Sequence, residues 1–337
     1  MPEKSDRILI VAPAWVGDMV MAQSLFITLK QQRPDCQIDV IAPAWTLPIL
    51  DRMPEVTKAI MQPLPRGKLG LIERIRLGKQ LRGENYKQAI LLTNTWKSAL
   101  TPFFANIPIR TGFIGEWRWG LLNDIRRLEP DILTQTVQRF VALSSSDKQS
   151  KKPFCPPPSL YVSDAHRQNV LQIHQLNIHG GVLALCPGAE FGDAKRWPLE
   201  HFAEIAKLSL DNGKQVWLFG SSKDSDVTAE INRLTSGRCI DLAGKTSLTE
   251  AVDLLSLVDT VVSNDSGLMH VAAALNKKVI ALYGSSDPGF TPPLNAQAQI
   301  IWLGLGCAPC FQRVCPLGHK RCLVDILPQQ VWALISN

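Results

Sequence analysis

Residues 261–275, with the sequence VVSNDSGLMHVAAAL, narrow the range of folds open to this chain more than any other segment. The β-branched start is typical of the end of a buried strand, and Leu268–Leu275 has the composition of a helix. Asp265 or Ser266 supplies the short oxygen-bearing side chain that caps a helix, and Gly267 lets the backbone approach a ligand. Such a strand–turn–helix junction is typical of parallel α/β sheets, and its free N–H groups suit a phosphate.

A second junction of this kind occupies residues 182–210. An apolar strand over Val182–Cys186 leads into a Pro-Gly turn, and a helix is predicted over Leu199–Leu210. Lys195 precedes that helix at the carboxyl end of the strand, which is where open α/β sheets bind their ligands. A cation at this point fits the charge of a phosphate, and a solvated surface lysine is the alternative interpretation.

A third junction lies at residues 7–30. It consists of a strand over Ile8–Val11, a tight loop at Pro13–Asp18 and a helix over Met19–Leu29. Asp18 stands near the N-terminus of this helix, where the helix dipole stabilises a negative charge. We therefore expect an ionised carboxylate that can accept a proton from a hydroxyl, with a helix cap as the alternative role.

Strand-like runs alternate with helical patterns through the rest of the chain. This alternation indicates α/β domains with parallel sheets and crossover helices. The runs are Ile38–Ala42, Gln88–Leu92, Val216–Phe219, Thr260–Ser263 and Val279–Leu282.

Four motifs carry a resemblance to a known family. They are AWVGDMVMAQSL (14–25), CPGAEFGDAKRWP (186–198), LAGKTSLTEAVDLLS (242–256) and NDSGLMHVAAAL (264–275). Together they resemble the lipopolysaccharide heptosyltransferases, the family that adds heptose to the inner core from ADP-heptose. The first loop, Trp15–Val20, is most similar to the heptosyltransferase II branch of that family.

The resemblance implies a GT-B architecture, an α/β fold with two Rossmann-like domains facing each other across a cleft. A length of 337 residues accommodates two domains of ordinary size, and the polar, Pro-rich stretch 147–160 is the expected linker. We expect an acceptor-binding N-terminal domain over residues 1–155 and a nucleotide-sugar-binding C-terminal domain over residues 156–337. The last helix is expected to pack back on the N-terminal domain.

The implied reaction is inverting transfer of heptose from ADP-L-glycero-D-manno-heptose to the heptosylated inner core, Hep-Kdo2-lipid A. Asp18 would remove the proton from the acceptor hydroxyl, and Lys195 would neutralise the charge on the leaving ADP. No metal is expected in catalysis, and no cofactor is expected beyond the substrate ADP-heptose. A heptosyltransferase of the I or III type, with another acceptor, is the alternative within the family.

The resemblance also implies donor-binding residues in the C-terminal half. Backbone N–H groups of the turn at Asp265, Ser266, Gly267 and Leu268 are expected to bind the pyrophosphate. His270 either contacts it or is a buried structural residue. Glu190 stands where relatives have small hydroxyl residues, and its charge would repel a phosphate. The donor-binding residues expected are Gly188, Ser221, Asp224, Thr246, Leu248, Asp265, Ser266, Gly267, Leu268 and His270.

Positive charge is concentrated in the N-terminal half. Residues 1–160 carry 22 Lys and Arg against 14 Asp and Glu, a net charge of +8, whereas residues 161–337 carry a net charge of −2. The segment 66–82 has six basic residues and one acid, with apolar residues at a helical spacing. It predicts a basic amphipathic helix that meets an anionic acceptor or membrane surface, or else a solvated helix. The acceptor-binding residues expected there are Arg66, Lys68, Arg74, Arg76 and Lys79.

The expected partners are therefore ADP-heptose, an acidic lipopolysaccharide inner-core acceptor and the inner-membrane surface. No signal peptide and no apolar run of about 18–20 residues is present, so we expect a cytoplasmic protein that is peripheral at the cytoplasmic face of the inner membrane. Nucleic acid is not an expected partner, because no zinc-finger, RRM or helix-turn-helix signature is found.

Four of the eight cysteines cluster near the C-terminus as Cys307, Cys310, Cys315 and Cys322. The CxxC start resembles a zinc knuckle, and His319 is a further candidate ligand. The remaining spacing is irregular, so the two interpretations are a structural zinc and free or redox-labile thiols.

Two other classes of function share features with this sequence. A Rossmann-type epimerase or oxidoreductase would need a G-x-G-x-x-G turn, and the chain contains none. A non-catalytic sugar-nucleotide binding protein would keep the junction at 264–275 but would need neither Asp18 nor Lys195.

Overall fold

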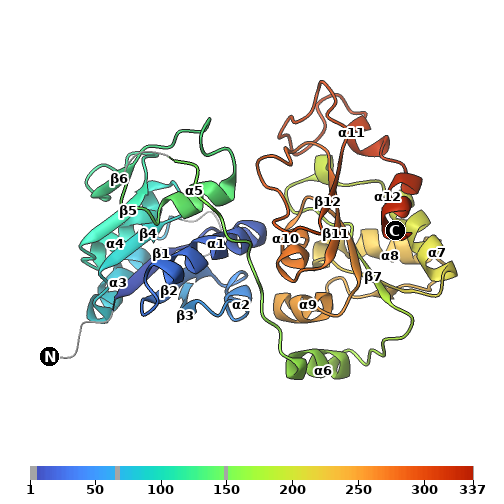
Figure 1. The fold of residues 1–337 in the computed structure, drawn as a ribbon, viewed down its shortest axis with the longest axis horizontal. Helices are drawn as coiled ribbons and strands as arrows, with labels where there is room; N and C mark the ends of the chain where they lie inside the picture. The colour runs from blue at the N-terminus through green and yellow to red at the C-terminus, as the bar shows by residue number, and fades with distance from the viewer. Residues whose placement is uncertain (1–5, 65–68, 148–150, 337) are drawn as a thin grey trace. The chain divides into compact units, whose positions relative to one another are not determined.

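The computed structural model describes residues 6–64, 69–147 and 151–336 of the chain. The chain divides into two compact units, Met1–Pro158 and Ser159–Asn337, each of which is described by itself (Figure 1). The division falls inside the Pro-rich stretch 147–160.

The first unit contains a parallel sheet whose described strands follow the order β3-β2-β1-β4-β5-β6. The central strands are almost completely buried, because helices cover both faces, and their sequences are accordingly continuous apolar runs. The strands are β1 (Arg7–Val11), β2 (Gln37–Pro43), β3 (Val56–Gln62), β4 (Gln88–Leu91), β5 (Ile109–Phe113) and β6 (Asp124–Arg126).

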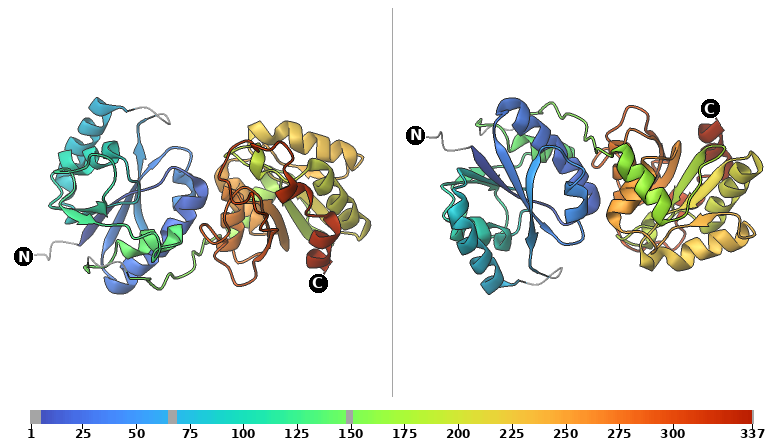
Figure 2. Two further views of the ribbon diagram at one scale, coloured as in Figure 1. Left: turned by 90° about the horizontal axis from the view of Figure 1, so that it is seen from above. Right: turned by 90° about the horizontal axis from the view of Figure 1, so that it is seen from below.

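The helices of the first unit lie on both faces of this sheet (Figure 2). Right-handed crossovers place α1, between β1 and β2, opposite α3, between β3 and β4. α5 packs against α1, and α4 packs against α3. The helical elements, with 3-10 turns labelled η, are α1 (Val16–Gln32), α2 (Leu47–Leu50), α3 (Leu71–Leu81), η1 (Arg82–Glu84), η2 (Trp96–Ala99), α4 (Leu100–Phe104) and α5 (Thr136–Ala142).

The second unit repeats the plan, with the described strands in the parallel order β12-β11-β10-β7-β8-β9. Its core is formed by apolar side chains of β7, β8, β10 and β11 packed against α7 and the C-terminal segment. The strands are β7 (Val182–Cys186), β8 (Gln215–Leu218), β9 (Ile240–Asp241), β10 (Thr260–Asn264), β11 (Lys278–Tyr283) and β12 (Gln299–Trp302).

The helices of the second unit follow the same rule as those of the first. α7 packs with α8 and α12, and α9 packs with α6 and α10. They are α6 (Asp164–Ile173), η3 (Asp193–Lys195), α7 (Leu199–Asp211), η4 (Ser222–Asp224), α8 (Ser225–Leu234), α9 (Leu248–Leu255), α10 (Gly267–Ala274), α11 (Arg321–Val324) and α12 (Pro328–Ser336).

The last helix is integrated into its own unit. α12 packs against α7 and β11, and its Val331 and Ile335 belong to the core of the second unit. Side chains of the second unit therefore cover the apolar side of this helix.

The predicted α/β class with two Rossmann-like parallel sheets is confirmed. All three predicted strand–turn–helix junctions are present, with boundaries that differ from the predicted ones by at most three residues. The largest shift is at α1, which begins at Val16 and not at Met19, so the predicted tight loop is shorter and Asp18 lies inside the first helical turn. Among the described residues, no helix is long and apolar enough to cross a membrane.

Candidate active site

The sequence-predicted donor residues gather at the carboxyl edge of the second sheet. They lie on the loops that follow β7, β8, β9 and β10, and parallel strands bring the ends of these loops to one side of the sheet. Polar contacts between the loops fix this edge.

An ion pair joins the β7 and β10 loops. Lys195 Nζ lies 2.5 Å from Asp265 Oδ2, and the Ser286 hydroxyl donates to the same oxygen at 2.6 Å. The lysine ammonium also lies 4.9 Å from the centre of the Phe191 ring. Asp265 and Ser286 are buried, so the ammonium is held in one place by a desolvated carboxylate and is not a mobile surface charge.

Asn264 ties the same two loops through its side-chain amide. Its nitrogen donates to Pro187 O at 2.7 Å, and its oxygen accepts from Trp197 N at 3.0 Å. Asn264 is completely buried, and both ends of its amide are satisfied. The residue therefore sets the distance between the strand end that precedes Lys195 and the start of α10.

The N-terminus of α10 lies at the centre of this edge. Ser266 is its N-cap residue but makes no side-chain cap bond, and its hydroxyl instead pairs with Ser263 at 3.1 Å. The N–H groups of Gly267 and Leu268 lie in the first helical turn, where no intrahelical carbonyl accepts them. Our expectation is wrong for Asp265, because its N–H donates to Leu282 O at 3.1 Å and is not available to a ligand.

His270 lies one turn into α10 and is buried. Burial is the main cause that lowers the pKa of this imidazole to about 4, and the nearby Lys195 charge acts in the same direction. The ring is therefore neutral at pH 7. A neutral imidazole beneath the helix N-terminus adds no charge of its own to the site.

Asp224 organises the neighbouring β8 loop. Its carboxylate accepts from the N–H and hydroxyl of Ser221 at 3.0 and 2.8 Å, and Arg196 lies 3.1 Å away. Gly188 gives the carboxylate room, because a Cβ at that position would lie 2.6 Å from Asp224. The structure thus brings Gly188, Ser221 and Asp224 together.

The outer part of this edge is formed by the turn before α9. Ser247 and Glu250 form a capping box there, with the Ser247 hydroxyl accepting from Glu250 N at 3.2 Å. Thr246 and Leu248 flank this cap and are half-buried. The expected repulsion from Glu190 is reduced, because Lys223 Nζ lies 2.7 Å from its carboxylate.

The proposed base belongs to the first unit. Asp18 lies in the first turn of α1, directly beyond the carboxyl end of β1, and is half-buried. This position stabilises its negative charge through the helix dipole. The Asp18 carboxylate therefore lies at the edge of the first sheet where its strands end.

The basic helix is shorter than expected, and one of its residues is assigned wrongly. Arg74 is only 7% exposed, donates to Leu69 O at 2.8 Å and has its pKa lowered by burial, so it does not present its charge at the surface. Arg76 and Lys79 are exposed and line an open depression with Ile72. Arg66 and Lys68 lie outside the described residues.

The apolar residues of this helix do not all lie on its buried side. Ile72 is largely exposed, and the buried side is formed by Arg74, Gly78 and Leu81. Gly78 is required there, because a Cβ would lie 2.6 Å from Thr101 O of α4. Close packing through Gly78 therefore determines which face of the helix is buried. Hydrophobic periodicity in the sequence does not reveal such a contact.

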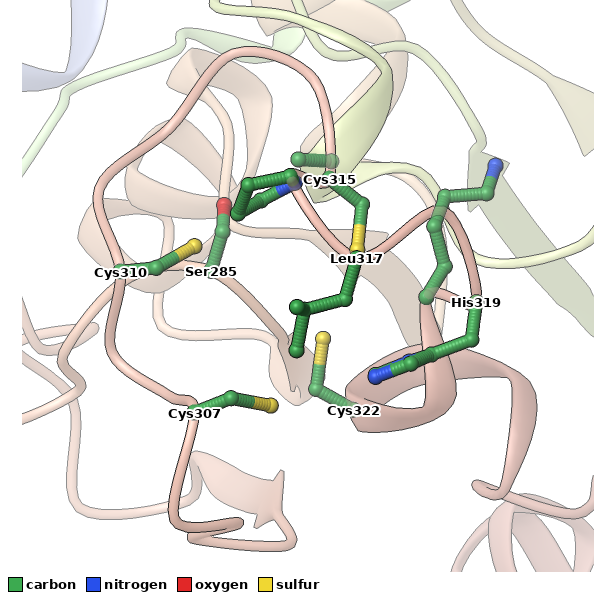
Figure 3. Close-up of a pocket in the computed structure, with 10 residues that line it drawn as sticks. Ser285, Cys307, Cys310, Cys315, Leu317, His319 and Cys322 are labelled. Atoms are coloured by element: carbon green, nitrogen blue, oxygen red, sulfur yellow. The ribbon is translucent and has the colours of Figure 1, made fainter.

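The four clustered cysteines line one small pocket together with His319 and Ser285 (Figure 3). Backbone N–H groups of residues 317–320, chiefly that of Lys320, lower the pKa of the Cys315 thiol. Within the part of the chain that the structure describes, no group of three or more His, Cys, Asp or Glu side chains is placed to hold a metal ion. The structural zinc interpretation is therefore not supported, and the cysteines are free thiols.

Sequence reasoning missed Asn264 and Ser286. Asn264 stands in the motif NDSG, but its role depends on β7 lying beside β10, which only the sheet order reveals. Ser286 follows β11 in the segment GSSDP, where small and polar residues directly after an apolar strand were the available signal.

Comparison with known proteins agrees with this arrangement. The model of glycosyltransferase family 9 (heptosyltransferase) matches residues 74–321. Lipopolysaccharide heptosyltransferase 2 of Salmonella typhimurium is 47% identical over 96% of both chains, and lipooligosaccharide heptosyltransferase 2 of Haemophilus influenzae is 48% identical over the same shares. The structure of E. coli ADP-heptose lps heptosyltransferase II matches with a TM-score of 0.86 and 43% identity, covering 98% of this chain and 97% of that chain. The chain therefore belongs to glycosyltransferase family 9, the heptosyltransferases, and has their GT-B fold.

Proposed function

We propose that this protein transfers heptose from ADP-heptose to the heptosylated inner core of lipopolysaccharide, with inversion at the anomeric carbon. The observation that carries the donor half is the ammonium of Lys195, held 2.5 Å from buried Asp265 beside the N-terminus of α10. A fixed cation next to unpaired helix N–H groups suits the pyrophosphate of a nucleoside diphosphate sugar. The relatives named heptosyltransferase 2 support this donor and this acceptor.

The second unit binds the donor in this proposal. The N–H groups of Gly267 and Leu268 donate to the pyrophosphate, and the ion pair with Asp265 directs Lys195 toward it. Asp224 and Ser221 lie on the next loop, and in the proposal their carboxylate and hydroxyl bind the ribose hydroxyls. Thr246 and Leu248 border the adenine. His270 stays neutral and buried, which fits a packing role under the turn.

The first unit supplies the acceptor side of the reaction. Asp18 takes the proton from the acceptor hydroxyl as its oxygen attacks the anomeric carbon of heptose. The bond from that carbon to the ADP oxygen breaks, and its electron pair stays on the β-phosphate, where Lys195 offsets the new negative charge. Positioning and charge stabilisation carry most of the rate, and the base adds about 10²–10⁴-fold.

The exposed face of α3 is the proposed contact surface for an anionic partner. Arg76 and Lys79 stand one turn apart beside exposed Ile72, so cationic and apolar groups share one side of the helix. Such a face attracts phosphorylated lipid–sugar headgroups and lies on an anionic membrane. In this proposal the protein contacts, through α3, the surface of the membrane that carries the lipid acceptor.

The test is transfer to defined acceptors. The protein is incubated with ADP-heptose and inner-core acceptors that carry no heptose, one heptose or two heptoses, and products are identified by mass spectrometry. We expect one added heptose on the acceptor that already carries one. Transfer only to the acceptor without heptose, or only to the one with two, would assign the chain to another acceptor type within the family.

A further inference from the structure

The tryptophans of the first unit are all exposed. Each is at least 36% accessible, and the values are Trp15 37%, Trp45 39%, Trp96 36%, Trp117 89% and Trp119 66%. In the second unit Trp197 and Trp217 are buried, whereas Trp302 is 37% exposed. Burying an indole ring is strongly favourable, so an exposed set of this size indicates a surface that meets a partner.

These side chains belong to one edge of the first sheet. Trp15 follows β1, Trp45 follows β2, Trp96 follows β4, and Trp117 and Trp119 follow β5, and all four strands are parallel neighbours. We call this set the tryptophan rim. Because the carboxyl ends of parallel strands share one edge, the rim lies on the same side of the sheet as Asp18.

The loops that carry the rim are fixed in place. The indole nitrogen of Trp45 donates to Ala14 O at 2.8 Å, which joins the β2 and β1 loops. The N–H of Trp96 donates to Glu116 Oε2 at 2.8 Å, which joins the β4 and β5 loops. The loops of the rim are therefore held in two pairs, β1 with β2 and β4 with β5.

Arg118 explains why its two neighbours point outward. Its guanidinium is completely buried and donates to Thr93 O at 2.7 Å, to Asn94 Oδ1 at 3.2 Å and to Phe113 O. With the side chain of residue 118 turned inward, Trp117 and Trp119 on either side of it are left in solvent. A charged residue is thus buried at the point where two aromatic residues are exposed, which is the reverse of ordinary packing.

We propose that the tryptophan rim is the docking surface for the sugar rings of the oligosaccharide acceptor, which stack their C–H faces on the indole rings. The inference rests on the proposed function and adds the part of the protein that reads the acceptor sugars. The electron-rich face of an indole attracts the weakly positive C–H groups of a pyranose ring, and the indole N–H serves its hydroxyls. A sugar seated on the rim lies on the edge of the sheet that carries Asp18.

Charge favours a sugar over a lipid surface as the occupant. Glu116 is exposed between the β4 and β5 tryptophans, and its carboxylate would repel an anionic membrane. The same carboxylate can accept hydrogen bonds from the uncharged hydroxyls of a sugar ring. The face suited to an anionic surface, with Arg76 and Lys79, belongs instead to α3.

The experiment compares Trp117→Leu/Trp119→Leu with Trp117→Tyr/Trp119→Tyr in the full-length protein. Leucine keeps apolar surface and removes the aromatic face, whereas tyrosine keeps a ring. Tyr161→Ala, which removes an exposed aromatic residue of the second unit, is the matched control. Binding is measured by tryptophan fluorescence and its acrylamide quenching with two probes, a delipidated acidic heptosylated oligosaccharide and sugar-free anionic vesicles.

We expect the leucine pair to raise the acceptor KM about tenfold or more, with the donor KM and kcat nearly unchanged, and the tyrosine pair to restore most of the loss. The oligosaccharide should protect wild-type fluorescence from acrylamide, and sugar-free vesicles should not protect the rim. Vesicle protection without oligosaccharide protection, or an unchanged acceptor KM in the leucine pair, would overturn the inference. A wild-type protein that transfers no heptose would contradict the proposed function, and oligosaccharide binding to the rim would still be measured separately.

Discussion

Lys195 and Asp265 are 70 residues apart in the sequence, and their side chains meet at 2.5 Å at the start of α10. The pair couples the cation proposed for the leaving group to the turn proposed for the pyrophosphate. Asp265 is buried and accepts a second bond from Ser286, so its carboxylate acts as a fixed anchor for the ammonium.

Removing the cation should affect donor binding and chemistry together. We expect Lys195→Ala to lower kcat/KM for ADP-heptose at least about 100-fold, because the ammonium offsets charge on both the bound and the leaving pyrophosphate. Stability should also fall by about 3–5 kcal/mol, since Asp265 keeps a buried charge without its ion partner. Steady-state kinetics and urea unfolding measure the two effects.

Two further variants make this test selective. Lys207→Ala removes an exposed lysine of α7 in the same unit and should leave both quantities unchanged. Asp265→Asn should recover much of the stability when combined with Lys195→Ala, because no uncompensated charge is then buried. Equal activity of Lys195→Ala and Lys207→Ala would remove Lys195 from the mechanism.

His270 predicts a pH dependence of stability. Burial lowers its pKa to about 4 in the folded protein, below the ordinary value of 6.5. Between these two pH values the imidazole is therefore protonated in the unfolded chain and neutral in the folded protein. The free energy of unfolding should therefore fall as the pH drops from about 6.5 to about 4. Urea unfolding at several pH values measures this slope.

The variant His270→Gln should flatten that part of the slope. His166→Gln, which removes an exposed histidine of α6, is the control and should follow the wild-type curve. Identical slopes for wild type and His270→Gln between pH 6.5 and 4 would show that the imidazole does not titrate as its burial implies.

The junctions of the fold could be predicted from the sequence because they are local. The apolar run of β7, the Pro-Gly turn after it and the helix of α7 follow from residues adjacent in the chain, and the observed bounds differ little from the predicted ones. Lys195 and Asp265 could likewise be placed at the ends of strands, although nothing in either motif indicates that the two side chains pair.

The predictions for Arg74 and for the Asp265 N–H are wrong because tertiary packing determines the position of both groups. Arg74 was expected at the surface, but close approach of α3 and α4 through Gly78 turns it inward. The N–H of Asp265 was expected to bind a ligand, but the neighbouring strand β11 brings Leu282 O within 3.1 Å of it. Both outcomes depend on a neighbour far along the chain, which a local pattern does not contain.

The exposed charges of α3 should matter for the acceptor alone. We expect Arg76→Glu/Lys79→Glu to raise the KM for a lipid-linked acceptor several-fold and to leave the donor KM unchanged, because both side chains lie at the surface of the first unit. Added salt should reduce the difference, since exposed charge contacts are screened over about 8–10 Å. Kinetics at two ionic strengths measure this.

Arg74→Gln and Lys87→Glu are informative comparisons for α3. Arg74 is buried, so its loss should lower the melting temperature more than it changes the acceptor KM. Lys87 is exposed just before β4 and outside α3, and its reversal should change neither quantity. An acceptor KM that responds equally to all of these changes would indicate a general effect of net charge and no docking face on α3.

Substitution of Asp18 tests whether the protein is an enzyme or a non-catalytic binding protein. Asp18→Asn keeps the size of the side chain and removes its basicity, so turnover should fall at least about 100-fold while the affinity for ADP-heptose stays near that of wild type. Loss of a helix-terminal charge alone would cost about 0.3–1 kcal/mol of stability and leave activity largely intact. Product formation on a verified acceptor, donor titration and thermal melting distinguish these outcomes.

Normal turnover by Asp18→Asn would assign the base to another acid of the first unit. Asp124 is a poor substitute, because its carboxylate is paired with Arg126 at 2.9 Å and accepts from Thr111. Glu116 is exposed beyond the carboxyl end of β5 and would be the next residue to test. Glu116→Gln keeps an oxygen that can accept from Trp96 N, so a loss of turnover in that variant would report the missing base and not a displaced loop.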